Sequence, residues 1–317
     1  MSNYGFFVLK VRPAVFAAVL VLSTAAPLCA GGQSEASDEN GADRPVVTTT
    51  FTIIEDFASR VAGEEAEVRN LTPAGAEVHE YELRPQDFVN LEEADIVFYN
   101  GFDIEQWIRQ VREVASGNAK IVPVAERADV STISIQMGEY EGRPDPHLWM
   151  DPGRAIGYVE VIRDELSDLD PESADAYERN AAEYIAELEQ LEDELHETLS
   201  VIPENRRILI TSEEAFLYFA SAFDFEHQGI WGTNHEDEGT PEQLARVIDL
   251  VRERRPPAVF WESTISDRHV RSVASDTGVR VAGPLYVDSI SASDPEVSDY
   301  ASLLRANVRL LVEEFGR

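Results

Sequence analysis

Short β-branched runs alternate with amphipathic segments from Val46 onward. Residues 46–54 form a β-branched run that predicts a buried strand, and the helical pattern of residues 55–62 ends at Gly63. The same alternation predicts further strands at residues 67–71, 95–100 and 120–124, and helices at residues 84–94 and 104–115. Strands that alternate with helices of this length indicate parallel βαβ units.

The same pattern returns after residue 205. It predicts strands at residues 207–211, 258–262 and 279–282, and helices at residues 212–223, 241–254, 267–277 and 300–315. Thr240 is placed to cap the second of these helices. The pattern therefore predicts two α/β halves.

A long helical pattern over residues 171–200 separates the halves, with no glycine and with proline only at its start. Its apolar positions recur in steps of three and four, which defines one helical face: Tyr177, Ala181, Tyr184, Leu188, Leu191, Leu195 and Leu199. Roughly 28 residues rising about 1.5 Å each give a helix of about 42 Å. We predict an α/β fold of two βα-lobes with parallel sheets, residues 46–170 and 201–317, joined by one long rigid helix, residues 171–200. The alternative is an ordinary surface helix of one large domain.

The N-terminal segment differs from the rest of the chain. Lys10 and Arg12 precede an apolar run at residues 14–26, and small residues follow at 30–32, which is the layout of a secretory signal peptide over residues 1–30. The polar residues 31–45 predict a flexible tether. We therefore expect an exported protein that is either periplasmic or anchored to the outer face of the cytoplasmic membrane.

The choice between these two locations depends on Cys29, the only cysteine. At the end of a signal peptide it suggests a lipidated first residue, which would be the chain's only contact with a membrane. Pro27 and Leu28 occupy positions where small residues are usual, so ordinary cleavage near Ala30 stays an equal alternative. A single cysteine makes no internal disulfide, so stability must come from core burial.

The net charge limits the classes of partner that the protein can bind. Sixty acidic residues against 26 basic ones give a formal charge of −34, which excludes sequence-independent binding to nucleic acid or to anionic lipid. Of the basic residues only Lys10 and Lys120 are lysine. The acidic excess fits either a surface adapted to high salt or a field that concentrates a cation, and composition leaves both interpretations open.

Four side chains follow predicted strands in equivalent places. His79 and His147 lie in loops of the first half, and Glu213 and Asp288 follow strands of the second. Because loops at the carboxyl ends of parallel strands build the ligand site, these four could converge between the lobes as a metal site. The other histidines have less suggestive neighbourhoods: His196, His227, His235 and His269.

Six stretches make a resemblance specific. PAGAEVHEYEL, ADIVFYNG, DPHLWMDP, TSEEAF, GTPEQL and YVDSI, in this order, resemble the metal-binding receptors of zinc and manganese ABC importers, the cluster 9 (cluster A-I) solute-binding proteins. The resemblance runs from about residue 48 to the C-terminus. It implies two α/β lobes bridged by one long helix, a metal site in the interlobe cleft with ligands His79, His147, Glu213 and Asp288, and delivery to an ABC permease with its ATPase subunits.

The expected ligand chemistry favours Mn²⁺. Two neutral imidazoles and two carboxylates neutralise one divalent ion, and oxygen donors suit Mn²⁺ or Fe²⁺ better than an all-imidazole set. In this family the third ligand tends to be His in zinc receptors and Glu in manganese or iron receptors, and this chain has Glu213. The segment 138–143 before His147 is also short and lacks the histidines of many zinc receptors. Fe²⁺ stays an alternative because the same oxygen donors suit it, and Zn²⁺ stays one because its intrinsic affinity for nitrogen and oxygen sites exceeds that of Mn²⁺.

Three other functions compete with a manganese receptor. One is a zinc-specific receptor of the same family. A second is a metal-dependent hydrolase with Glu214 or the acidic loop 236–238 as base, and a third is a surface adhesin. The sequence has no HExxH, nucleophile elbow or phosphate-binding loop, and four protein ligands leave little room for a substrate. We therefore expect a monomeric receptor that is not an enzyme.

Overall fold

The first half of the chain forms one parallel sheet. The computed structural model describes residues 44–115, 117, 119–138, 140–233 and 239–316. Four strands pair in the order β2-β1-β3-β4, all parallel: β1 (Val46–Thr49), β2 (Glu67–Asn70), β3 (Ile96–Tyr99) and β4 (Lys120–Pro123). The helices that alternate with them are α1 (Thr52–Ala62), α2 (Pro85–Glu93), α3 (Ile108–Ala115) and α4 (Val124–Arg127).

The second half repeats this architecture with two strand pairs. Parallel pairing joins β5 (Ile208–Glu213) to β6 (Glu226–Trp231), and β7 (Ala258–Glu262) to β8 (Arg280–Leu285). Strand β5 lies next to β7. The helices are α7 (Leu217–Ala222), α8 (Pro241–Arg254), α9 (Arg268–Thr277) and α10 (Tyr300–Phe315). The prediction of an α/β fold with parallel sheets is confirmed.

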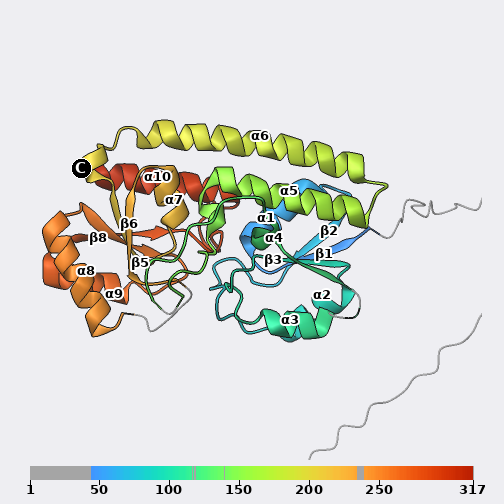
Figure 1. Cartoon of the computed structure of the whole chain (residues 1–317), viewed down its shortest axis with the longest axis horizontal. Coiled ribbons are helices and arrows are strands. Elements are labelled where there is room, and N and C mark those ends of the chain that lie inside the picture. The colour runs from blue at the N-terminus through green and yellow to red at the C-terminus, as the bar shows by residue number, and fades with distance from the viewer. Residues whose placement is uncertain (1–43, 116, 118, 139, 234–238, 317) are drawn as a thin grey trace, which may run out of the picture. The chain divides into compact units, whose positions relative to one another are not determined.

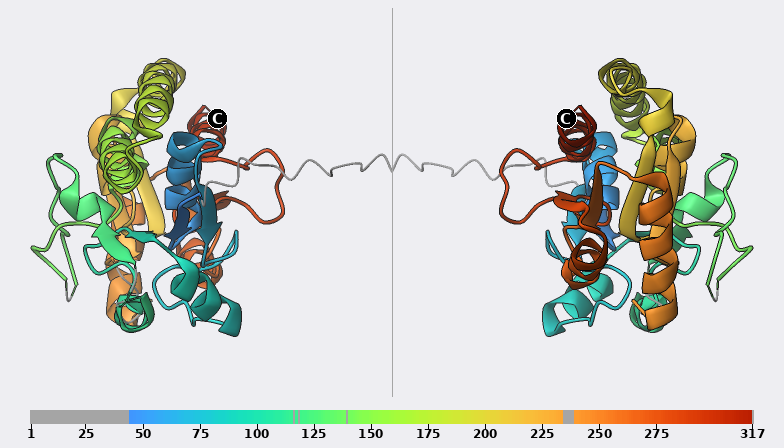
Figure 2. Two further views of the ribbon diagram at one scale, coloured as in Figure 1. Left: turned by 90° about the vertical axis from the view of Figure 1, so that its right-hand side faces the viewer. Right: turned by 90° about the vertical axis from the view of Figure 1, so that its left-hand side faces the viewer.

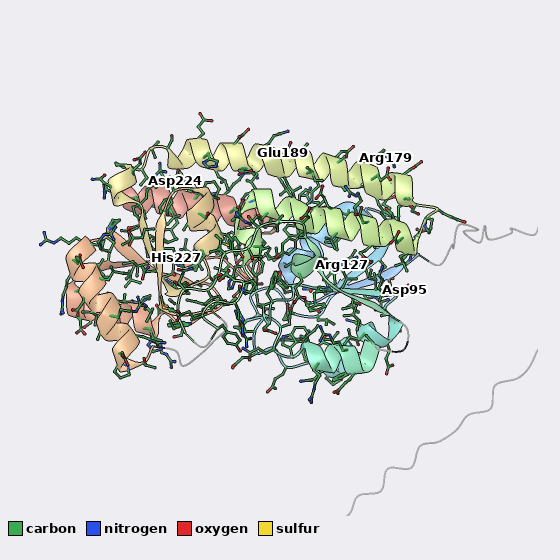
Figure 3. The ribbon with its side chains drawn as sticks, viewed as in Figure 1. Asp95, Arg127, Arg179, Glu189, Asp224 and His227 are labelled. Atoms are coloured by element: carbon green, nitrogen blue, oxygen red, sulfur yellow. The ribbon has the colours of Figure 1, made fainter. Side chains whose placement is uncertain are left out.

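The long helix predicted for residues 171–200 is α6 (Ala174–Leu199), and the seven apolar positions predicted for one face are its buried residues. It lies beside α5 (Pro152–Leu169), and it also packs on α1 and on α10, so it contacts both halves (Figures 1 and 2). Its opposite side is exposed and carries charged side chains such as Arg179 and Glu189 (Figure 3). Two 3-10 helices complete the described elements, Leu148–Met150 and Glu204–Arg206.

One hydrophobic core runs through both halves. The fully buried ring of Phe57 in α1 lies 5.7 Å from Tyr158, 6.1 Å from Tyr184 and 4.9 Å from Tyr300, measured between ring centroids. These three tyrosines come from α5, α6 and α10 in turn. Since close-packed interiors resist deformation, this aromatic cluster restricts movement of the two halves against each other.

Several predicted boundaries are wrong, such as that of the helix predicted at residues 104–115, which begins at Ile108, and tertiary contacts explain two of them. Residues 52–54 were predicted as strand, but they begin α1, where Thr52, Ile53 and Ile54 are all buried. A short apolar run buried on every side has no periodicity that separates strand from helix. Residues 212 and 213 were predicted as helix, but they continue β5, because Glu213 pairs with Trp231 of β6. That pairing is long-range and leaves no local pattern.

Several predictions fall on parts of the chain outside the described residues. These are the signal peptide (1–30), nearly all of the tether (31–45), Cys29, His235 and the acidic loop 236–238. Among the described helices, none is long and apolar enough to span a membrane.

Candidate metal centre

His79 lies in the loop between β2 and α2 and its side chain is fully buried. The backbone on either side of it is fixed by the segment that precedes α3. Trp107 donates its indole N–H to the carbonyl of Val78 at 2.7 Å, and the amide of Gln106 donates to the carbonyl of His79 at 3.3 Å. The imidazole therefore projects from a loop whose main chain is held by hydrogen bonds to the segment before α3.

His147 immediately precedes the 3-10 helix Leu148–Met150 and is also fully buried. Asp145 positions it, because its Oδ1 accepts the backbone N–H of His147 at 2.9 Å and lies 3.2 Å from Nδ1 of the ring. The other oxygen of Asp145 accepts the hydroxyl of Thr233 at 3.0 Å. A carboxylate on Nδ1 fixes the tautomer that leaves Nε2 as an electron-pair donor, which is how histidine ligands are commonly prepared.

The two carboxylates come from strand ends of the second half. Glu213 is the last residue of β5, and its backbone N–H donates to the buried carboxyl group of Glu262 at 3.1 Å. Asp288 follows β8, and the carbonyl of the preceding Val287 accepts the indole N–H of Trp149 at 3.1 Å. The side chains of Glu213 and Asp288 are 1% and 2% exposed, so both carboxylates are removed from water.

The structure brings all four predicted ligands together. His79 Nε2 lies 3.6 Å from Glu213 Oε1 and 4.0 Å from Asp288 Oδ2, and His147 Nε2 lies 3.7 Å from Asp288 Oδ1. Ligand atoms of His79, His147 and Glu213 all lie within 4.8 Å of one another. Two ligands each about 2.1 Å from one ion at a tetrahedral angle are about 3.4 Å apart, so these separations suit a single ion with small adjustments.

A fifth side chain, the acidic Glu77, lies at the same place. Ligand atoms of Glu77, His79 and Asp288 are also within 4.8 Å of one another, and Glu77 Oε1 is 3.9 Å from His79 Nε2. Sequence reasoning missed Glu77, Asp145, Thr233 and Glu262. A pattern was available for two of them: an acidic residue stands two positions before each histidine, in Glu77-Val78-His79 and Asp145-Pro146-His147.

Hydrogen bonds tie the loops of the two halves together beside the site. Ser289, next to Asp288, accepts the amide of Gly75 at 2.7 Å and lies 3.3 Å from the hydroxyl of Thr52. Thr52 in turn accepts the amide of Ile290 at 3.1 Å. Gly75 has a φ of +78°, and a Cβ at this position would lie 3.1 Å from the Cβ of Ala292, so the close approach favours glycine.

Burial and neighbouring charges shift the acid–base behaviour of the residues around the site. Burial lowers the pKa of His147, but the carboxylate of Asp145, with help from Asp288, outweighs it and raises the pKa above the ordinary value. Burial raises the pKa of Glu262 to about 8 and that of Glu214 to about 7. Burial therefore favours the protonated form of both carboxyl groups.

The remaining described histidines lie elsewhere. His227 is on β6, where its Nε2 is 2.8 Å from the hydroxyl of Thr211, and burial lowers its pKa to about 3 (Figure 3). It is a neutral core histidine and not part of the group of candidate ligands. His196 is on the exposed side of α6 and His269 is on α9.

A family model described as "ZnuA: Zinc-uptake complex component A periplasmic" matches residues 47–314. This chain belongs to the ZnuA family. The resemblance seen in the six sequence motifs is thereby confirmed over nearly the whole folded part. Members of this family are metal-binding transport receptors and not enzymes, so the hydrolase alternative is excluded.

Relatives within the family carry names for different metals. The chain is 38% identical over 307 residues to the iron-binding protein YfeA of Yersinia pestis, covering 96% of this chain and 97% of that protein. It is 36% identical over 294 residues to the manganese-binding lipoprotein MntA of Halalkalibacterium halodurans, covering 93% and 95%. A Mn-bound periplasmic metal binding protein from Candidatus Liberibacter asiaticus superposes with a TM-score of 0.77 at 29% identity, covering 86% of this chain and 100% of that one.

The buried acid Glu262 predicts a pH dependence of stability. Its pKa of about 8 in the folded protein exceeds its ordinary value of 4.5, so the folded state holds an extra proton between these values. This contribution to stability is complete below about pH 4.5 and is lost as the pH rises through about 8. In Glu262→Gln the amide oxygen can still accept the N–H of Glu213, but no proton is lost. We expect the free energy of unfolding of the metal-free protein, measured by urea denaturation from pH 5.5 to 8, to fall less steeply in Glu262→Gln than in the wild type.

Glu189→Gln on the exposed side of α6 is the matched control, and its slope should equal that of the wild type. Equal slopes for Glu262→Gln and the wild type would contradict a protonated Glu262.

Proposed function

We propose that this chain is the extracytoplasmic receptor of a metal ABC importer and that His79, His147, Glu213 and Asp288 bind one divalent ion as its cargo. The observation that carries the proposal is the convergence of two buried imidazoles and two buried carboxylates from four separate segments, three loops and the end of β5. Burying carboxylates is costly without a compensating charge, and a divalent cation compensates two of them at once. Membership of the ZnuA family supports the same function.

Mn²⁺ is the cargo that we favour, with Fe²⁺ and Zn²⁺ as alternatives. Two carboxylates supply oxygen donors, and a third ligand that is Glu213 instead of a histidine reduces the nitrogen character that suits Zn²⁺. The relatives named for manganese and for iron support this choice. A purified sample can nevertheless carry Zn²⁺, because intrinsic affinity for nitrogen and oxygen sites is higher for Zn²⁺ than for Mn²⁺.

Delivery follows from the family's role. The receptor carries the ion to a membrane permease, and the ATPase subunits of that importer drive uptake, so the receptor itself hydrolyses nothing. We propose that the protein works as a monomer outside the cytoplasm, either free in the periplasm or held at the membrane by lipid on Cys29. The lipoprotein names of several relatives support the second arrangement.

The aromatic cluster around Phe57 and the hydrogen bond between Thr52 and Ser289 limit how release can occur. A wide opening would have to separate packed rings of α1, α5, α6 and α10, whereas a shift of the ligand loops would not. We therefore propose that the ion leaves by rearrangement of the loops that carry His79, His147 and Asp288, with little change in α6.

The ligand assignment predicts the effect of His147→Ala. Removing a partner outside the coordination shell already costs about 10- to 100-fold in metal affinity, so loss of a ligand should cost more than about 100-fold. Titration calorimetry with Mn²⁺ should show one site in the wild type and no stoichiometric binding in His147→Ala. His196→Ala, on the exposed side of α6, is the control and should bind as the wild type does. Full affinity in His147→Ala would overturn the assignment.

The role given to Glu213 predicts a change of preference in Glu213→His. A third imidazole makes the site richer in nitrogen, so the ratio of Zn²⁺ to Mn²⁺ affinity should rise by about tenfold or more. Competition titrations with both metals measure this ratio. Glu213→Gln separates charge from ligand type, because it removes the carboxylate without adding an imidazole and should weaken both metals. A ratio in Glu213→His equal to the wild-type ratio would contradict the proposed role.

A further inference from the structure

The two histidines of the site are each preceded by an acidic residue that forms the same backbone hydrogen bond. Glu77 Oε1 accepts the amide of His79 at 2.7 Å, as Asp145 Oδ1 accepts the amide of His147 at 2.9 Å. Both carboxylates therefore shape the turn that presents a histidine. If this were their whole role, the two would be expected to sit alike toward the rings.

The two carboxylates instead lie beside different ring nitrogens of their histidines. Asp145 is fully buried and lies 3.2 Å from Nδ1 of His147, on the side of the ring away from Asp288. Glu77 lies 3.9 Å from Nε2 of His79, the same nitrogen that Glu213 and Asp288 approach at 3.6 and 4.0 Å. Asp145 thus contacts Nδ1 of His147, the nitrogen away from the proposed ion, whereas Glu77 approaches Nε2 of His79, the nitrogen that would bind it.

Exposure separates Glu77 from the four proposed ligands. Its side chain is 22% exposed, whereas His79, His147, Glu213 and Asp288 are 2% exposed or less. Its ligand atoms group with those of His79 and Asp288, while the other group consists of His79, His147 and Glu213. Glu77 therefore lies at the solvent side of the centre and shares His79 with the buried set.

The carboxylate of Glu77 is also fixed and still able to bind a cation. Besides the amide of His79, its second oxygen accepts the amide of Glu80 at 3.0 Å. Each carboxylate oxygen has a further lone pair after accepting one hydrogen bond. In the described part of the chain no arginine or lysine is ion-paired with Glu77, so its negative charge is available to a cation.

We propose that Glu77 is a transit ligand: an ion that enters or leaves is held by Glu77, His79 and Asp288 before or after it occupies the buried site. A hydrated divalent cation must exchange its waters for protein oxygens, and a partly exposed, preoriented carboxylate beside a shared histidine allows this exchange to proceed in steps. The inference rests on the proposed function of the chain as a metal receptor. It concerns how fast the ion moves, not how tightly it is held.

A general electrostatic effect is the main competing explanation. A cavity of about 440 Å³ next to His79 is lined by two further acidic residues, Glu80 and Glu82, which are exposed. Negative charge near an entrance raises the association rate of a cation without any specific contact. Glu80→Gln removes one charge three residues from Glu77 and is therefore the matched control for Glu77→Gln.

The experiment measures both rates of Mn²⁺ exchange. Trp149 lies 5.2 Å from the ring of His147, which makes its fluorescence a reporter of an ion in the buried site. Stopped-flow mixing with Mn²⁺ gives the association rate, and mixing of the loaded protein with a chelator gives the dissociation rate. Equilibrium titration gives Kd independently, and circular dichroism checks that each variant is folded.

A transit ligand lowers the barrier in both directions and leaves the end states unchanged. We therefore expect Glu77→Gln to slow association and dissociation by about tenfold each, with Kd within about threefold of the wild type. Glu80→Gln should change association only slightly and leave dissociation unchanged. The pair Glu77→Asp and Glu77→Asn, which differ in charge and not in size, should reproduce the contrast, with Asp the faster, even if the Gln variant does not fold.

Two outcomes overturn the inference while the proposed function stands. If association and dissociation rates in Glu77→Gln equal those in Glu80→Gln, Glu77 acts only through its negative charge and makes no specific contact with the ion. A faster dissociation with a weaker Kd makes Glu77 a resident ligand of the bound ion. If the wild-type protein binds no Mn²⁺, Fe²⁺ or Zn²⁺ at all, it is the proposed function that fails.

Discussion

The rest of this structure depends on one constraint: two carboxylates, those of Glu213 and Asp288, are buried beside His79 and shielded from water. Glu213 and Asp288 approach His79 Nε2 at 3.6 and 4.0 Å while almost fully buried. Two buried negative groups beside the same imidazole repel one another unless protons or a cation compensate them. Burial raises the pKa of two neighbouring acids, Glu262 and Glu214, for the same reason. Binding of a divalent ion satisfies the same need with a ligand of defined geometry.

The fold supplies the rigidity that such an arrangement requires. Repulsion between the carboxylates would spread flexible loops apart, but the loops here are anchored from several directions. Thr233 reaches Asp145 from the other half, Ser289 holds Gly75, and Trp149 donates to Val287 beside Asp288. Phe57 and its three tyrosine neighbours then join α1, α5, α6 and α10 in one core. Each half contributes two of the four proposed ligands, so neither half alone contains the proposed site.

The sequence predicted those features that have a local or periodic cause. The buried face of α6 follows from its apolar spacing, and α8 begins where Thr240 and Gln243 form a capping box. The four candidate ligands were predicted from their places after predicted strands, where parallel sheets build their sites, although Glu213 lies within β5 and His147 lies well beyond the end of β4. Their assignment to one ion needed the resemblance to a known family, since spacing alone does not bring separate loops together.

What the sequence did not predict depends on contacts between distant segments. The extension of β5 through Glu213 follows from pairing with β6. Thr52, Ile53 and Ile54 are all buried in α1, so their apolar run has no periodicity that separates helix from strand. The different orientations of Glu77 and Asp145 have the same origin, because equal spacing before a histidine does not fix which ring nitrogen the carboxylate meets. The acidic composition does not identify the site, because only two of the 60 acidic residues, Glu213 and Asp288, are among the four proposed ligands.

Anomalous diffraction at the manganese absorption edge tests the central claim most directly. Crystals of the folded chain grown with Mn²⁺ should show one strong anomalous peak about 2.0–2.3 Å from Nε2 of His79, Nε2 of His147 and carboxylate oxygens of Glu213 and Asp288. A peak located elsewhere, or one that contacts only one of these four side chains, would contradict the account.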